Sequence, residues 1–131
     1  MRDSEVRGAR GSAAVEFALV LPLLLTLALA LLQVGLIAKD QLVVQEAGRA
    51  GARQASVSND DASVREAVNE AAAGLSPSLL TTTVRRGSGR GTPVAVDVEY
   101  EAPITVPLVG WLLPGAVRLS TETTMRQEVT P

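Results

Sequence analysis

An uncharged run of 22 residues, from Phe17 to Ala38, constrains this chain of 131 residues more than any other feature. As an α-helix the run would be about 33 Å long, enough to cross the roughly 30 Å hydrocarbon core of a bilayer. Glu16 precedes the run, and Lys39 and Asp40 follow it. The rest of the chain is too small to surround such a helix as a soluble core. We therefore predict a transmembrane helix over residues 17–38.

A cleaved secretory signal is the alternative explanation of this run. The apolar region of such a signal is only about 7–15 residues long, and the string Ala28-Leu29-Ala30 fits its cleavage pattern. Cleavage after Ala30 would release a soluble exported domain. However, the chain stays apolar from Leu31 to Ala38, which a signal peptide does not require. The length of the run therefore favours a retained membrane helix.

The distribution of basic residues does not predict in which direction this helix crosses the membrane. Three precede the run and three follow it closely, so the positive-inside rule returns a tie. They are Arg2, Arg7 and Arg10 before the run, and Lys39, Arg49 and Arg53 after it. Because most of the chain follows the span, we take as the default a cytoplasmic N-terminus and an extracytoplasmic C-terminal domain.

The composition removes several classes of function. The chain has no Cys, so it has neither a disulfide framework nor a Cys-ligated metal site. It has no His, which removes the commonest general base and metal ligand. A net charge of −2 leaves no basic footprint for nucleic acid, and no phosphate loop or dinucleotide fingerprint is present. We predict a non-enzymatic protein with no cofactor, no metal site and no nucleic-acid partner.

Helical patterning continues beyond the predicted span. Ala47, Gly51 and Ala55 recur every four residues, as in the small-residue ladders that let helices pack closely. We therefore expect the first helix to run over residues 12–56. Two explanations of the ladder stay open, namely close approach of another helix and packing against this protein's own domain.

A small α+β domain is predicted after this helix, over residues 57–131. Capping residues at 58–61 begin a second helix over residues 61–73, and Gly74 ends it. The hydrophobic period then changes from 3.6 to 2, which predicts strands. The three predicted strands cover residues 79–86, 94–101 and 117–126. Such a unit buries only one face, so docking on the first helix would complete its core.

Three features of this domain have more than one interpretation. The basic turn over residues 85–91 is either a solubilising hairpin tip or a contact for anionic surfaces. Asp97, Glu99 and Glu101 form either a solvated edge or a cation site. The apolar segment 104–115 is too short, and too broken by Pro and Gly, to span a bilayer. It either folds over its own sheet or contacts the membrane interface or a partner subunit.

The junction before the span resembles that of type IV pilin-like proteins. It reads Gly11-Ser12-Ala13-Ala14-Val15-Glu16-Phe17 after a short polar leader. In particular, it resembles the TadE-like minor pseudopilins of tight-adherence (Flp-type) pilus systems. Their precursors carry a charged leader that ends in Gly, then a small residue, Glu at the fifth mature position and an aromatic residue. Pro22 in the apolar helix and the small-residue stretch 46–55 are also similar to this family.

The resemblance implies a role for each residue of the junction. A prepilin peptidase would cleave between Gly11 and Ser12, leaving a mature chain of residues 12–131. Glu16, with Phe17 beside it, would set the register of assembly by pairing with the terminal amine of a neighbouring subunit. A carboxylate in an apolar helix bundle needs such a counter-charge, or else a proton. Pro22 removes one helical hydrogen bond and is expected to kink the helix.

We therefore predict an α+β structural protein, a minor pilin or pseudopilin of a tight-adherence pilus. Its implied partners are the prepilin peptidase, other pilin or pseudopilin subunits, the pilus assembly platform and the lipid bilayer. Cell adhesion would be a property of the assembled surface fibre. The alternative function is a single-span, membrane-anchored extracytoplasmic binding module that is not processed.

Overall fold

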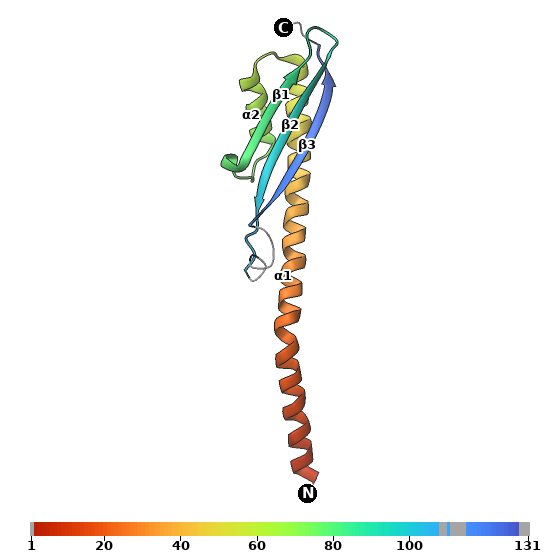
Figure 1. The fold of residues 1–131 in the computed structure, drawn as a ribbon, viewed down its shortest axis with the longest axis vertical. Helices are drawn as coiled ribbons and strands as arrows, with labels where there is room; N and C mark the ends of the chain where they lie inside the picture. The colour runs from red at the N-terminus through yellow and green to blue at the C-terminus, as the bar shows by residue number, and fades with distance from the viewer. Residues whose placement is uncertain (1, 108–109, 111–114, 129–131) are drawn as a thin grey trace.

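The computed structural model describes residues 2–107, 110 and 115–128 (Figure 1). The described part contains two α-helices, a short 3-10 helix and one three-stranded sheet. They are α1 (Arg2–Val57), α2 (Asp61–Ala71), η1 (Pro77–Leu79), β1 (Leu80–Arg86), β2 (Pro93–Pro103) and β3 (Ala116–Arg126). The predicted α+β class is confirmed, with its long N-terminal helix, short helix and small antiparallel sheet. Residues 108–109 and 111–114 of the apolar segment 104–115 lie outside the described residues.

One continuous helix, α1, forms the axis of the molecule. It begins at Arg2, so the leader is helical too, and not only the expected residues 12–56. Residues 33–57 lie alongside α2 and the sheet, whereas residues 12–32 extend beyond them (Figure 1). We call residues 12–32 the bare segment of α1 and residues 33–57 its covered segment.

The second helix is short and one-sided. Asp60 caps it, because the two carboxylate oxygens accept hydrogen bonds from the backbone N–H groups of Ala62 (3.0 Å) and Ser63 (3.1 Å). Val64 and Val68, one turn apart, are buried. The helix ends at Ala71, two residues earlier than expected, and Gly74 follows with a positive φ of 100°. This position suits glycine because side chains with a Cβ disfavour that conformation.

The sheet has the order β1-β2-β3, with both pairs antiparallel. Alternation along β2 decides which face is covered: every second residue from Val94 to Ala102 is buried. Asp97, Glu99 and Glu101 alternate with these residues on the opposite face. The expectation that they form an edge is wrong, because β2 is the central strand and β1 and β3 flank it.

The core lies where the covered segment, α2 and the inner face of the sheet meet. Small residues supply the α1 side of this core, and valines supply most of the remainder. Its fully buried members include Val44, Ala47, Ala52, Ala55, Val64, Val68, Val94, Val96 and Val98. Small side chains on the helix let the sheet approach closely, so the domain packs onto α1 as the sequence predicted.

Candidate functional site

The bare segment is the largest apolar surface of the described chain. Its large side chains face outward on every side of the helix: Phe17 is 62% exposed, Leu23 69% and Leu31 65%. It is part of the one described helix that is long and apolar enough to cross a membrane. A surface of this size and composition is not stable in water, so it requires lipid or other helices around it.

The predicted processing junction lies at the start of the bare segment, within α1. Gly11 and Ser12 are both helical. The Ser12 hydroxyl donates a hydrogen bond to Glu16 Oε1 at 3.1 Å, one helical turn away. Glu16 is exposed and forms no ion pair with any residue whose side chain the structure describes. A carboxylate and its apolar neighbour Phe17 thus occupy the same end of the helix.

Pro22 lies inside α1, and the helix is continuous through it. The hydroxyl of Thr26 donates to the carbonyl oxygen of Pro22 at 2.8 Å. Such a bond satisfies the carbonyl locally, as is common beside proline in membrane helices. The expected kink at Pro22 stays a prediction.

The small-residue ladder lies in the covered segment, not in the bare one. Ala47 and Ala55 are fully buried in the core of this chain. A Cβ placed on Gly51 would lie 2.5 Å from Val68 Cγ2 and 3.1 Å from Val96 Cγ1. The helix that approaches Gly51 closely is therefore α2 of the same chain, and β2 lies against the same spot.

Gln33 marks the junction between the two segments, and the sequence reasoning missed it. It is the polar residue near the end of the apolar run, yet it is only 2% exposed. Its Oε1 accepts a hydrogen bond from the backbone N–H of Val106 at 3.1 Å. The signal available in the sequence was a single amide among apolar residues; its partner lies 73 residues away and could not be identified from it.

The predicted basic turn is only partly a turn. Arg85 and Arg86 belong to β1, and the turn follows them. Arg86 is largely buried and donates to Asp61 Oδ1 (2.8 Å) and to the carbonyl oxygen of Ala55 (2.8 Å). Arg85 pairs with Asp97 Oδ2 at 2.8 Å and with Glu122 Oε1 at 3.2 Å. Arg86 therefore ties β1 to α1 and α2, whereas Arg85 is exposed and pairs with side chains of the other strands in the sheet.

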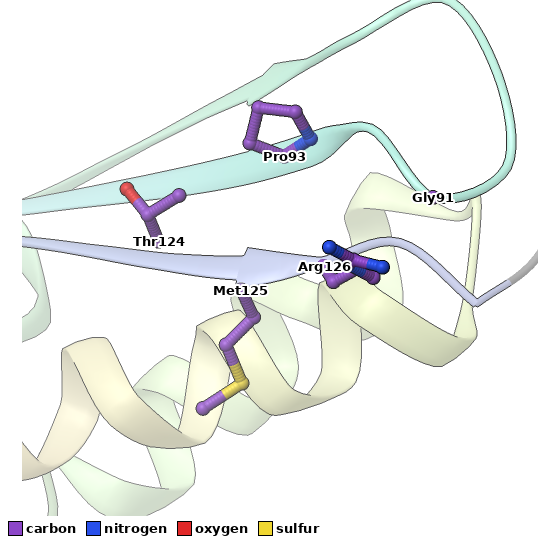
Figure 2. Close-up of a pocket in the computed structure, with 5 residues that line it drawn as sticks. All are labelled: Gly91, Pro93, Thr124, Met125 and Arg126. Carbon is purple, nitrogen blue, oxygen red and sulfur yellow. The ribbon is translucent and has the colours of Figure 1, made fainter.

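Two hollows on the described surface are lined without a catalytic constellation. One lies where β2 begins and β3 ends and is lined by Gly91, Pro93, Thr124, Met125 and Arg126 (Figure 2). In Figure 2, Met125 points toward the helices, whereas Thr124 points to the opposite side of the sheet. Within the described residues, no group of three or more acidic side chains is placed to hold a metal ion.

These features define a class of protein: a small α+β domain built on the C-terminal part of a long helix whose preceding segment, residues 12–32, is apolar and bare. The family model described as TadE-like protein matches residues 11–53 of this chain. The match agrees with the resemblance drawn from the junction, and the N-terminal apolar helix fits it. It covers the junction, the bare segment and most of the covered segment. Searches of curated proteins and of solved structures found no match.

Proposed function

We propose that this chain is a minor pilin or pseudopilin of a tight-adherence pilus. Prepilin peptidase removes the leader after Gly11, and the mature protein waits in the membrane with its C-terminal domain outside the cytoplasm. It then joins or primes a pilus through helix packing along the bare segment. This role is structural and non-enzymatic. It involves other pilin or pseudopilin subunits and the assembly platform.

One observation carries the proposal: a carboxylate stands at the start of a helix segment that exposes apolar side chains on all sides and packs against none of the other elements that the structure describes. Burying such a segment against lipid or against other helices is favourable, at about 25 cal/mol per Å² of apolar surface. Burying Glu16 is costly unless a cation or a proton neutralises it. Cleavage after Gly11 would create a cation at the same helix end, namely the free amine of Ser12.

We assign a separate role to each segment of α1. The covered segment is occupied by its own domain, so it offers its small-residue ladder to no other subunit. The bare segment has no such occupant among the described residues. Packing between subunits would therefore use the bare segment, in the bilayer first and in a filament afterwards.

The test is the N-terminus of the protein purified from native membranes, by intact mass and N-terminal peptide sequencing. We expect a chain that begins at Ser12. Gly11→Val should block this cleavage, because the peptidase must approach the backbone closely at that point. Gly8→Val makes the same change in the same leader and should leave the product unaltered.

Other N-termini would contradict the proposal in distinct ways. A chain that begins at Met1 would be an unprocessed membrane-anchored binding module. A chain that begins at Leu31 would be an exported domain released by signal peptidase. A chain that begins at Ser12 in cells without the prepilin peptidase would assign the cleavage to another enzyme.

A further inference from the structure

Two uncharged stretches of the chain meet in space. The first is the apolar run of α1, residues 17–38, and the second is the chain from Ala102 to Val117, which also lacks charged residues. The second stretch includes the β2–β3 end of the sheet, meaning the described residues 102–107 and 115–117. In Figure 1 this end lies beside α1 and points toward the bare segment. The bond between Gln33 and Val106 fixes the contact.

Two hydrogen bonds define the position of the sheet along the axis of α1, which we call its height. Gln33 binds Val106, and eight residues later Gln41 Nε2 donates to the carbonyl oxygen of Ser120 at 3.3 Å. Eight helical residues cover about 12 Å. Four strand residues, from Ser120 back to Ala116, cover about 13 Å. Ala116 therefore lies at about the height of Gln33, which is roughly 9 Å toward the N-terminus from Lys39.

The same alignment places four charges at a common height. Arg118 lies two strand residues from Ala116, about 7 Å further along, and so near the level of Lys39. It pairs with Glu101 at 3.8 Å, and Lys39 pairs with Asp40 at 3.8 Å. One pair lies on α1 and the other on the sheet, and together we call them the charged belt. From the belt down to Phe17, the described residues of both stretches carry no charge.

We propose that the β2–β3 end of the sheet is seated in the membrane interface, below the charged belt, with lipid as its partner. This inference rests on the proposed anchoring of α1 in the bilayer. If all of residues 17–38 lie in the apolar layer of the bilayer, this layer ends near Ala38. The Gln33–Val106 contact, five residues before Ala38, must then lie on the bilayer side of that boundary. The side chains exposed at this end suit that position, since none is charged: they are Pro103, Thr105, Pro107 and Ala116.

Hydrogen bonding at this end is consistent with a poorly hydrated site. The N–H of Val106 is taken up by Gln33, and the N–H of Ile104 donates to the carbonyl oxygen of Gly115 at 3.3 Å. Backbone donors left unpaired at this depth would each cost several kcal/mol. Gln33 is only 2% exposed and its Oε1 is paired with Val106, so the helix keeps this amide away from the lipid.

The experiment uses the absence of Cys from the chain. Single cysteines replace three exposed residues: Leu24→Cys in the bare segment, Pro107→Cys at the β2–β3 end, and Ser88→Cys at the opposite end of the sheet. Each full-length variant carries an environment-sensitive fluorophore and is reconstituted in phosphatidylcholine–phosphatidylglycerol vesicles. Quenching by lipid-borne nitroxides, placed near the headgroup or near the chain end, is compared with quenching by iodide in the water.

We expect the label at position 107 to be quenched most by the headgroup-proximal nitroxide, and the label at position 88 by iodide alone. The label at position 24 should respond most to the nitroxide near the chain end. If positions 107 and 88 respond alike to iodide while position 24 responds to lipid, the anchor stands and the inference fails. If position 24 responds to iodide, the proposed anchoring itself fails. Shielding of position 107 from both quenchers would mean that a second copy of the chain covers this end, which also overturns the inference.

Discussion

The bare and covered segments of α1 form one continuous helix, but their apolar side chains are distributed differently around the helix axis. The bare segment carries large apolar side chains on every side, so only a surrounding medium of lipid or several helices can cover it. The covered segment buries small residues on one side and exposes charged residues such as Glu46 and Arg49 on the other. The comparison shows that the angular width of the apolar surface, not helix propensity, determines what a segment packs against.

The largest expected effect is that of a charge placed in the bare segment. Leu24→Asp puts a carboxylate near the centre of the proposed span, where it costs about 3 kcal/mol of insertion free energy. This corresponds to roughly a hundredfold in the membrane-bound fraction at equilibrium. The variant should be extracted from membranes by alkaline carbonate, whereas the wild-type chain should stay in the pellet.

Leu42→Asp is the matched control, since Leu42 is 66% exposed but lies in the covered segment beyond Lys39. It should leave carbonate resistance unchanged. Equal extraction of the two variants would remove the distinction between the segments.

A smaller effect is expected from the arginine that ties the domain to the end of α1. Arg86→Met removes the bonds to Asp61 and to the carbonyl oxygen of Ala55. Charged hydrogen bonds of this kind contribute about 1.5–3 kcal/mol each, and we expect a net loss of about 2 kcal/mol in the free energy of unfolding. The measurement is urea unfolding of the full chain in detergent micelles, followed by circular dichroism.

Arg85→Met provides the comparison on the neighbouring residue. Arg85 is 59% exposed, and exposed ion pairs contribute only about 0.2–1 kcal/mol. Arg86→Met should therefore be the more destabilising change. A larger loss from Arg85→Met would mean that the outer face of the sheet, not the Arg86 contact, holds the domain together.

Most of the fold follows from local patterns, which is why it could be predicted from the sequence. The apolar run fixed the helix, and the alternation from Val94 to Tyr100 fixed a strand. Element ends moved by a few residues because caps and pairing partners extend or shorten them. The processing residues Gly11 and Glu16 were found through their spacing and their resemblance to a family, and their roles stay predictions.

The features that escaped prediction are contacts between residues far apart in the chain. Gln33 and Val106 are 73 residues apart, and Arg86 and Ala55 are 31 apart. Nothing near Gln33 in the sequence indicates a buried amide. The ladder at Gly51 had two explanations for the same reason, since small residues permit close packing without specifying the partner.

Two glycines of α1 should respond differently to replacement by alanine. Gly51→Ala would place its Cβ 2.5 Å from Val68, and overpacking of this kind costs about 1–3 kcal/mol. Gly35→Ala meets nothing within 4 Å, so it should only gain the helix propensity of alanine, about 0.5–1 kcal/mol. The two variants should therefore change the urea midpoint in opposite directions. If both variants were less stable than the wild-type chain, Gly35 would also have to pack against a close neighbour.

The smallest expected effect comes from the cap of α2, which tests whether the covered segment and the bare segment are independent. Asp60→Ala removes the acceptors for Ala62 and Ser63, and we expect a loss of about 0.5–1 kcal/mol in the free energy of unfolding. Asp60→Asn keeps an acceptor at the same position and should recover most of that loss. Carbonate resistance should not change in either variant, because α2 contacts the covered segment through Val64 and Val68 and the bare segment provides the membrane anchor. A loss of membrane association in Asp60→Ala, without loss in Asp60→Asn, would show instead that the domain helps to hold the chain in the bilayer. The stability of the domain and the membrane anchoring by the bare segment would then not be independent.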